Sequence, residues 1–143
     1  MKRELEFASH PGNLCLVRDF VRQFLEPIAL PTTEKDLIVL GVDEACTNVI
    51  RYAYCHKEDE PMHLVCEDRG DHVVFRLRDF GTQCVSSQLK GRDLEDVQPG
   101  GLGLHLIRRA FSKVDYDLKM EGTELVLRKD VSGKSAKGLT EQP

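Results

Sequence analysis

The stretch VDEACTNVIRYAY (residues 42–54) lies in a helix that the spacing of apolar residues predicts over residues 32–53. Apolar residues occupy two opposite faces, so the helix is predicted to be buried nearly all round. These residues are Leu37, Leu40 and Gly41 on one face and Val39, Val42, Cys46, Val49 and Ala53 on the other. Glu44 and Asn48, four residues apart, interrupt the first face, where an unpaired buried carboxylate would be costly.

The Glu44 and Asn48 pair has two interpretations. In the first, both are satisfied core residues: Glu44 accepts hydrogen bonds from backbone groups and Asn48 bonds a neighbour. In the second, Glu44 is a general base and the Asn48 carboxamide oxygen faces a hard cation such as Mg²⁺, which prefers oxygen ligands. The residue spacing leaves both open.

The rest of the chain predicts an α+β fold. Alternation predicts strands over residues 2–8, 62–66, 73–77, 114–120 and 123–127, and helical spacing predicts further helices over residues 11–30 and 102–111. Paired strands beside grouped helices favour a two-layer sandwich, with a mixed, mostly antiparallel sheet covered on one face by helices, rather than a Rossmann fold.

Local signals mark the ends of these elements. Thr32 or Thr33 is expected to cap the helix over residues 32–53. Residues 1–130 are expected to form one domain. Residues 131–143 are polar and without pattern, and are predicted to be a disordered tail.

Composition excludes several classes of protein. The 143 residues include 20 Lys and Arg against 24 Asp and Glu, a formal net charge of −4, so the chain lacks the clustered basic charge of a nucleic-acid binder. Its five cysteines show neither metal-ligand spacing nor a disulfide framework. Because it has no apolar leader or membrane-spanning stretch, we expect no membrane association and a cytoplasmic location.

A second interruption of the apolar pattern occurs at Asp79. Strand alternation places it on the same face as Phe75 and Leu77, toward the helices, where the strand ends. This carboxylate needs a donor, which could be the backbone of the following loop or the exocyclic amine of a purine. Gly81 would let the backbone turn closely beside a flat base, because it has no Cβ.

A third interruption is the stretch PGGLGL (residues 99–104), which opens the helix over residues 102–111. Glycines at a helix start expose backbone N–H groups that can bind phosphate without net basic charge. Glycine runs also simply start helices. Residues 82–99, before this stretch, form a loop long enough to be a functional lid or a mobile segment.

Taken in order, these motifs resemble the ATP-binding GHKL superfamily, the Bergerat fold of gyrase, Hsp90, histidine kinases and MutL. They are Glu44-Ala45-Cys46-Thr47-Asn48 on a helix, Asp79-Phe80-Gly81 at a strand end and Gly100-Gly101-Leu102-Gly103-Leu104 at a helix start, with Gly122-Thr123 at the last hairpin as a fourth. Within the superfamily, residues 42–54 look most like the anti-sigma-factor serine kinases of the RsbW and SpoIIAB type. The resemblance covers about residues 1–130.

This resemblance implies a role for each matching residue. Asn48 would bind the Mg²⁺ that bridges the phosphates of ATP, and Glu44 would take the proton from an incoming hydroxyl. Asp79 would hold the adenine amine, with Gly81 beside the base and Thr123 near it.

The glycine stretch would bind the phosphates in the same scheme. Gly101, Gly103 and Leu104 would offer backbone N–H groups, and residues 82–99 would close as the lid. Such chemistry consists chiefly of positioning and charge neutralisation, so few side chains suffice.

The chain departs from the family pattern at two positions. Tyr52 stands where many relatives have His, and the stretch Gly81-Thr82-Gln83-Cys84 after Asp79 lacks the second glycine that is often seen there. Within the predicted lid, Lys90 and Arg92 could reach a γ-phosphate or remain solvated loop charges.

Three functions remain open at this point. The resemblance implies a Mg-ATP-dependent serine kinase that phosphorylates a STAS-type anti-anti-sigma protein and sequesters a sigma factor, and it implies a homodimer. The rival is a switch module in which nucleotide sets only partner binding, without kinase turnover. In the third, every polar residue singled out above is structural.

Overall fold

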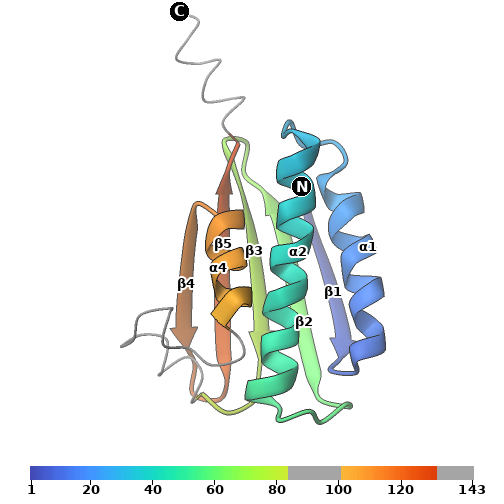
Figure 1. Ribbon diagram of the computed structural model, residues 1–143, viewed down its shortest axis with the longest axis vertical. Coiled ribbons are helices and arrows are strands. Elements are labelled where there is room, and N and C mark those ends of the chain that lie inside the picture. Colours follow the sequence, from blue (N-terminus) through green and yellow to red (C-terminus); the bar gives the residue numbers. More distant parts are fainter. Residues whose placement is uncertain (84–100, 132–143) are drawn as a thin grey trace, which may run out of the picture.

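Five strands form one sheet in the order β1-β2-β3-β5-β4 (Figure 1). The structure, a computed structural model, describes residues 1–83 and 101–131. The strands are β1 (Lys2–Ala8), β2 (Pro61–Asp68), β3 (His72–Asp79), β4 (Lys113–Leu118) and β5 (Thr123–Asp130). All pairings among these strands are antiparallel, so the predicted antiparallel character is confirmed and the described sheet has no parallel pair.

The helices lie together on one face of this sheet, which confirms the predicted two-layer α+β sandwich (Figure 1). They are a 3₁₀ turn (Pro11–Asn13), α1 (Leu14–Leu25), α2 (Thr32–Asn48), a π-helical turn (Val49–Ala53) and α4 (Gly101–Ala110). The predicted long helix therefore changes hydrogen-bonding pattern immediately after Asn48. Such π turns are uncommon and frequently occur at functional sites.

The strand register aligns an apolar row under the helices. Across the five strands the row is Leu5, Leu64, Leu77, Leu125 and Tyr116. The next inward position of β3, toward its end, is Asp79, which pairs with Thr123. The register therefore places a carboxylate where the pattern of the sheet calls for an apolar side chain.

Aromatic rings join the two layers in the core. Phe75 of β3 makes edge contacts with Phe24 of α1 and with Phe111 after α4, at ring-centre distances of 5.6 and 5.7 Å. A Cβ added to Gly41 of α2 would lie 2.9 Å from the Phe111 ring and 3.0 Å from the Ala110 Cβ. Gly41 therefore allows α2 and α4 to pack closely.

Two predicted helix ends were wrong. The first helix ends at Leu25 rather than near residue 30, because single turns replace it there, with Ile28 N–H bonded to Leu25 O. The cap of α2 is Pro31, whose carbonyl accepts from two backbone N–H groups, and neither Thr32 nor Thr33 is the cap.

The prediction that α2 is buried nearly all round was also wrong. Leu40 is 48% exposed, and Glu44 is only half-buried. The solvent side of this helical layer bears ion pairs instead: Arg18 with Asp43 at 2.9 Å, and Arg22 with Asp36 at 3.0 Å. A helix in the outer layer of a two-layer fold must expose one side.

The last described residue, Val131, is buried, and its N–H donates to Asp71 O at 2.9 Å. The packed part of the chain thus extends one residue into the predicted tail. Residues 84–100, which include Lys90 and Arg92 of the predicted lid, and residues 132–143 lie outside the described residues.

Replacing Phe75 by alanine is expected to lower the free energy of unfolding by about 3–5 kcal/mol, because its ring is fully buried between α1 and the end of α4. Urea unfolding followed by circular dichroism measures this loss. Phe80→Ala is the control: its ring is 42% exposed, and its loss should be about 1 kcal/mol or less. Equal losses for the two variants would contradict the assigned core.

Candidate functional site

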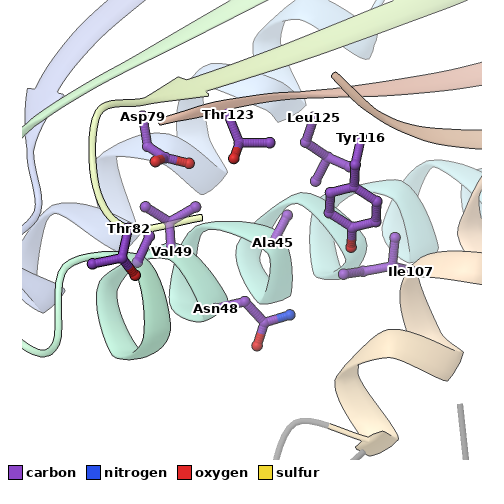
Figure 2. Close-up of a pocket in the computed structure, with 10 residues that line it drawn as sticks. Ala45, Asn48, Val49, Asp79, Thr82, Ile107, Tyr116, Thr123 and Leu125 are labelled. Carbon is purple, nitrogen blue, oxygen red and sulfur yellow. The ribbon is translucent and has the colours of Figure 1, made fainter. Parts of the chain in front are cut away.

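A pocket lies between the end of α2 and the inner face of β3, β4 and β5 (Figure 2). Its lining residues are Ala45, Asn48, Val49, Ala53, Asp79, Thr82, Ile107, Tyr116, Thr123 and Leu125. The structure thus brings together three predicted site residues that are far apart in the sequence: Asn48, Asp79 and Thr123. In Figure 2, Asn48 and Asp79 lie on opposite sides of this pocket.

Asp79 supplies a buried acceptor at one end of the pocket. Its side chain is only 4% exposed, and Gly81 N–H donates to Oδ1 at 2.9 Å. The backbone N–H of Thr123 also bonds it. Burial raises the pKa of Asp79 above its ordinary value, and these two donors oppose the shift. The loop-backbone donor considered from the sequence is therefore present.

Gly81 packs directly on the π-helical turn. An added Cβ would lie 2.3 Å from Ala53 O and 2.9 Å from a ring carbon of Tyr54. The next residue, Thr82, donates its N–H to the same Ala53 O at 2.9 Å. The chain can pack this closely only because Gly81 has no Cβ. The place of Gly81 beside a base stays a prediction.

The Tyr54 hydroxyl links the segment after β3 to the start of β2 through two hydrogen bonds. It donates to Pro61 O at 2.5 Å and accepts from Phe80 N–H at 2.8 Å. Burial raises the pKa of Tyr54, so the hydroxyl keeps its proton at neutral pH. The sequence analysis did not identify this residue, because nothing in the local pattern shows that two distant backbone groups meet at its ring.

Gly122 fixes the opposite strand next to Asp79. Its φ of +79° confirms the predicted turn, and an added Cβ would lie 2.0 Å from Asp79 O. A left-handed backbone against a neighbouring strand leaves room for glycine alone. Gly122 therefore allows the start of β5, with Thr123, to lie close to Asp79.

Glu44 and Asn48 lie one turn apart on the flank of α2 that faces α4, in line with Gly41. Both are half-buried, and neither side chain has a hydrogen-bond or ion-pair partner within residues 1–83 and 101–131. The predicted deep burial of Glu44 is therefore wrong, and the satisfied core pair is not found among the described residues. Asn48 lines the pocket, whereas Glu44 does not.

The glycine stretch begins α4 at residue Gly101. The N–H groups of the first turn of an α-helix lack partners within the helix, so a start at Gly101 is compatible with the predicted phosphate contacts, and the roles of Gly101, Gly103 and Leu104 stay predictions. The Leu104 side chain itself is buried in the core. In Figure 1 this helix lies beside α2, and Gly100 lies outside the described residues.

The apolar walls of the pocket contain residues that the sequence analysis did not assign to a site. Ile107 comes from α4, and Tyr116 and Leu125 come from neighbouring strands (Figure 2). Burial raises the pKa of Tyr116 to about 12. Alternation could have placed the two strand residues on the inner face, but only the register shows that they stand beside Thr123.

A model of the histidine kinase-like ATPase domain matches residues 7–129. The chain belongs to this family. This confirms the identification as an ATP-binding domain of the GHKL superfamily, and the relatives below support the anti-sigma kinase type within it.

Three curated relatives show which members of the family are similar to this chain. The serine/threonine-protein kinase BtrW of Bordetella bronchiseptica is 30% identical over 63% of this chain and 66% of its own length. The serine-protein kinase RsbW of Listeria monocytogenes is 32% identical over 66% and 65%. The alignments thus span just under two thirds of these two kinases. The anti-sigma F factor of Clostridium beijerinckii is 25% identical over 90% of this chain and 93% of its own.

Solved structures support the fold. The RsbU and RsbW domains of a Mycobacterium tuberculosis protein superpose with a TM-score of 0.67 at 16% identity, over 92% of this chain and 32% of that one. A structure of the SiaB-SiaC complex from Pseudomonas aeruginosa gives 0.58 at 18% identity, over 87% of both chains. At these identities the likeness concerns the fold alone.

Two features are absent from the described residues. No three His, Cys, Asp or Glu side chains among them cluster as a metal site. None of the helices within residues 1–83 and 101–131 combines the length and apolarity needed to cross a membrane.

Replacing Asp79 by asparagine is expected to remove one pH-dependent component of stability. A folded-state pKa above the unfolded value means that wild type loses stability as pH rises from about 4 through that raised pKa. The variant lacks this loss, so its stability relative to wild type should increase across the interval. Urea unfolding from pH 4 to pH 7 measures the difference.

Asp71→Asn provides a control of opposite sign. Asp71 is exposed, and its hydrogen bond with His72 lowers its pKa. Any stability from this contact is present at neutral pH and lost on acidification. If wild type gained stability relative to Asp79→Asn as pH rose, the assigned burial of the Asp79 carboxyl would be incorrect.

Proposed function

We propose that this protein is a Mg-ATP-dependent protein serine kinase that phosphorylates a STAS-type anti-anti-sigma partner and sequesters a sigma factor. The observation that carries the proposal is the polarity of one pocket. A buried carboxyl with its backbone donors stands at one end, and an amide without a partner among the described residues stands at the other.

The Asp79 end fits an adenine base. Apolar walls from Val49, Ile107 and Leu125 suit a flat ring, and the Asp79 carboxyl offers an acceptor to an exocyclic amine. Thr123 stands next to it in the register. A guanine would direct a carbonyl oxygen at this acceptor, so the pocket favours adenine.

The Asn48 end fits a magnesium ion that arrives with the triphosphate. Mg²⁺ keeps several waters and uses few protein oxygens when phosphates supply the rest. One amide oxygen is therefore a sufficient protein ligand, in keeping with the absence of an acidic metal cluster from the described residues. The backbone N–H groups of Gly101, Gly103 and Leu104 would face the phosphates at the start of α4.

Glu44 would act as the general base. Its half-buried carboxylate lies one turn before Asn48, on the same flank of α2. There it would accept the proton of an incoming serine hydroxyl as the oxygen attacks the terminal phosphorus of ATP and the bond to the departing ADP breaks. Its position outside the pocket lining suits a group that meets the protein substrate rather than the nucleotide.

The partners are proposed from the relatives. One relative is named an anti-sigma F factor and two are named serine or serine/threonine kinases, and the SiaB neighbour was solved as a complex with SiaC. A STAS-type substrate and a sigma factor are consistent with these names, and the homodimer is proposed from the family resemblance alone. The charge of −4 agrees with partners that are proteins rather than nucleic acid.

Glu44→Gln separates the kinase from a switch without turnover. The variant should retain MgATP affinity within about twofold, while phosphate transfer to the STAS partner falls about 10²- to 10⁴-fold, the usual contribution of a positioned general base. Radiolabelled transfer and calorimetric titration measure the two quantities. Wild type that binds MgATP but transfers no label would overturn the kinase proposal and favour the switch.

Asn48→Ala tests the proposed cation ligand. The variant should lose most of the increase in ATP affinity that Mg²⁺ gives wild type, because the carboxamide oxygen is absent. ATP titrations with Mg²⁺ and with EDTA measure this increase. Thr47→Ala, one residue earlier and hydrogen-bonded to Asp43 O, is the matched control and should keep it.

A further inference from the structure

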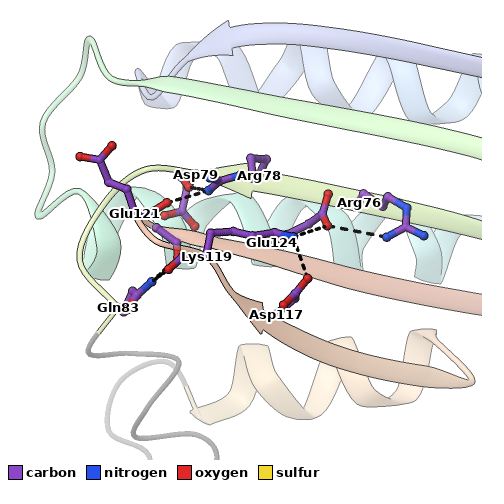
Figure 3. Close-up of polar contacts among 9 residues, drawn as sticks. Arg76, Arg78, Asp79, Gln83, Asp117, Lys119, Glu121 and Glu124 are labelled. Carbon is purple, nitrogen blue, oxygen red and sulfur yellow. Dashed lines mark hydrogen bonds and ion pairs between the residues drawn. The ribbon is translucent and has the colours of Figure 1, made fainter.

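The Gln83 side chain connects the segment after β3 to the turn between β4 and β5 (Figure 3). Its amide nitrogen donates to Lys119 O at 2.6 Å and to Gly122 O at 2.5 Å. The two carbonyls belong to one turn, and the two hydrogens of the amide satisfy both. This contact was not identified from the sequence, where Gln83 was only one residue of a stretch without the second glycine of the family pattern.

These bonds close a ring around the Asp79 end of the pocket. The chain leaves the sheet at Asp79 and, at Gln83, returns to the turn that leads into Thr123. Thr123 is the register partner of Asp79, which closes the other side. Within the ring, Gly81 N–H donates to the Asp79 carboxylate.

A second anchor holds the same segment against α2. Thr82 N–H donates to Ala53 O at 2.9 Å, and Phe80 N–H donates to the Tyr54 hydroxyl at 2.8 Å. The backbone between Asp79 and Gln83 is thus fixed to the helical layer on one side. On the β5 side, the Gln83 side chain bonds the segment to the turn.

Arg78 adds a charge-assisted bond across the same turn (Figure 3). It donates to Glu121 O at 3.0 Å and to Asp79 O, and its guanidinium lies 4.1 Å from the centre of the Phe80 ring. Arg78 therefore fixes the turn to the end of β3. The Gln83 amide fixes the chain to the same turn four residues after Asp79.

We propose that Gln83 is a positioning residue for the base end of the nucleotide pocket: its double hydrogen bond holds the Asp79–Gln83 segment in its binding conformation before the nucleotide arrives. This inference rests on the proposed function, because it presumes that the base binds at Asp79. A segment that is already ordered does not lose conformational entropy on binding, which raises affinity without adding a contact. The effect concerns the base, and the phosphate end is independent of it.

Two variants of the full chain remove the double bond in different ways. Gln83→Met keeps the length of the side chain and lacks the donors. Gln83→Glu is nearly isosteric and turns a carboxylate toward two carbonyl oxygens. Each is titrated with MgATP and with magnesium tripolyphosphate, which lacks the base, after circular dichroism has confirmed that it is folded.

The expected result is a selective loss. MgATP affinity should fall about fivefold to tenfold for Gln83→Met, and further for Gln83→Glu, while tripolyphosphate affinity stays within about twofold of wild type. A residue that serves only global stability would lower the unfolding midpoint and leave the ratio of the two affinities unchanged.

Ser9→Ala is the matched control for losing a buried bridge. The Ser9 hydroxyl donates to Lys57 O and accepts from Glu60 N–H at 3.1 Å, in a loop that does not line the pocket. Its loss should lower stability and keep the affinity ratio.

Three results would overturn these ideas in different ways. If wild type failed to bind MgATP, the proposed function and this inference would both fall. If wild type bound MgATP and both Gln83 variants kept the wild-type ratio, only the role of Gln83 would be refuted. Equal losses for ATP and tripolyphosphate would also refute it, because the effect would then not be specific to the base end.

Discussion

The burial of the Asp79 carboxyl is the constraint on which the pocket depends. A carboxyl in an inward row of a sheet must have hydrogen-bond donors or it destabilises the fold. Gly81 N–H and Thr123 N–H supply them. Near each donor, the backbone of a glycine packs against another segment too closely for a side chain. Gly81 lies against Ala53 O, and Gly122 lies against Asp79 O. The tight packing at this end of the molecule follows from keeping one polar group inside it.

The two ends of the pocket differ in how they are built. At the Asp79 end, strand register, glycine contacts and the Tyr54 hydroxyl hold the backbone on several sides. At the Asn48 end, the side chains of Glu44 and Asn48 have no hydrogen-bond or ion-pair partner among the described residues. A preformed end suits a rigid planar base, and an end with available polar groups suits phosphates and a hydrated cation.

Most of the architecture could be predicted because it depends on local periodicity. Alternation placed Phe75 and Asp79 on one inner face of the sheet. The turn at Gly122 was predicted from the glycine in the sequence, and the structure gives this residue a positive φ. Burial around α2 could not be predicted in the same way. Whether Leu40 or Glu44 is covered depends on how the neighbouring elements pack against α2, and the periodicity of α2 does not determine that packing.

The sequence by itself determined the order of the elements, the two-layer class, and the three motifs whose succession places the chain in its family. The tertiary structure decided which of these groups share a pocket: it joined Asn48, Asp79 and Thr123 and left Glu44 on the flank of α2. It also assigned roles to Tyr54 and Gln83, which bond backbone groups of distant segments. Such bonds leave no periodic signal, because their partners are carbonyl and N–H groups that every residue possesses, and only the folded register decides which of them meet.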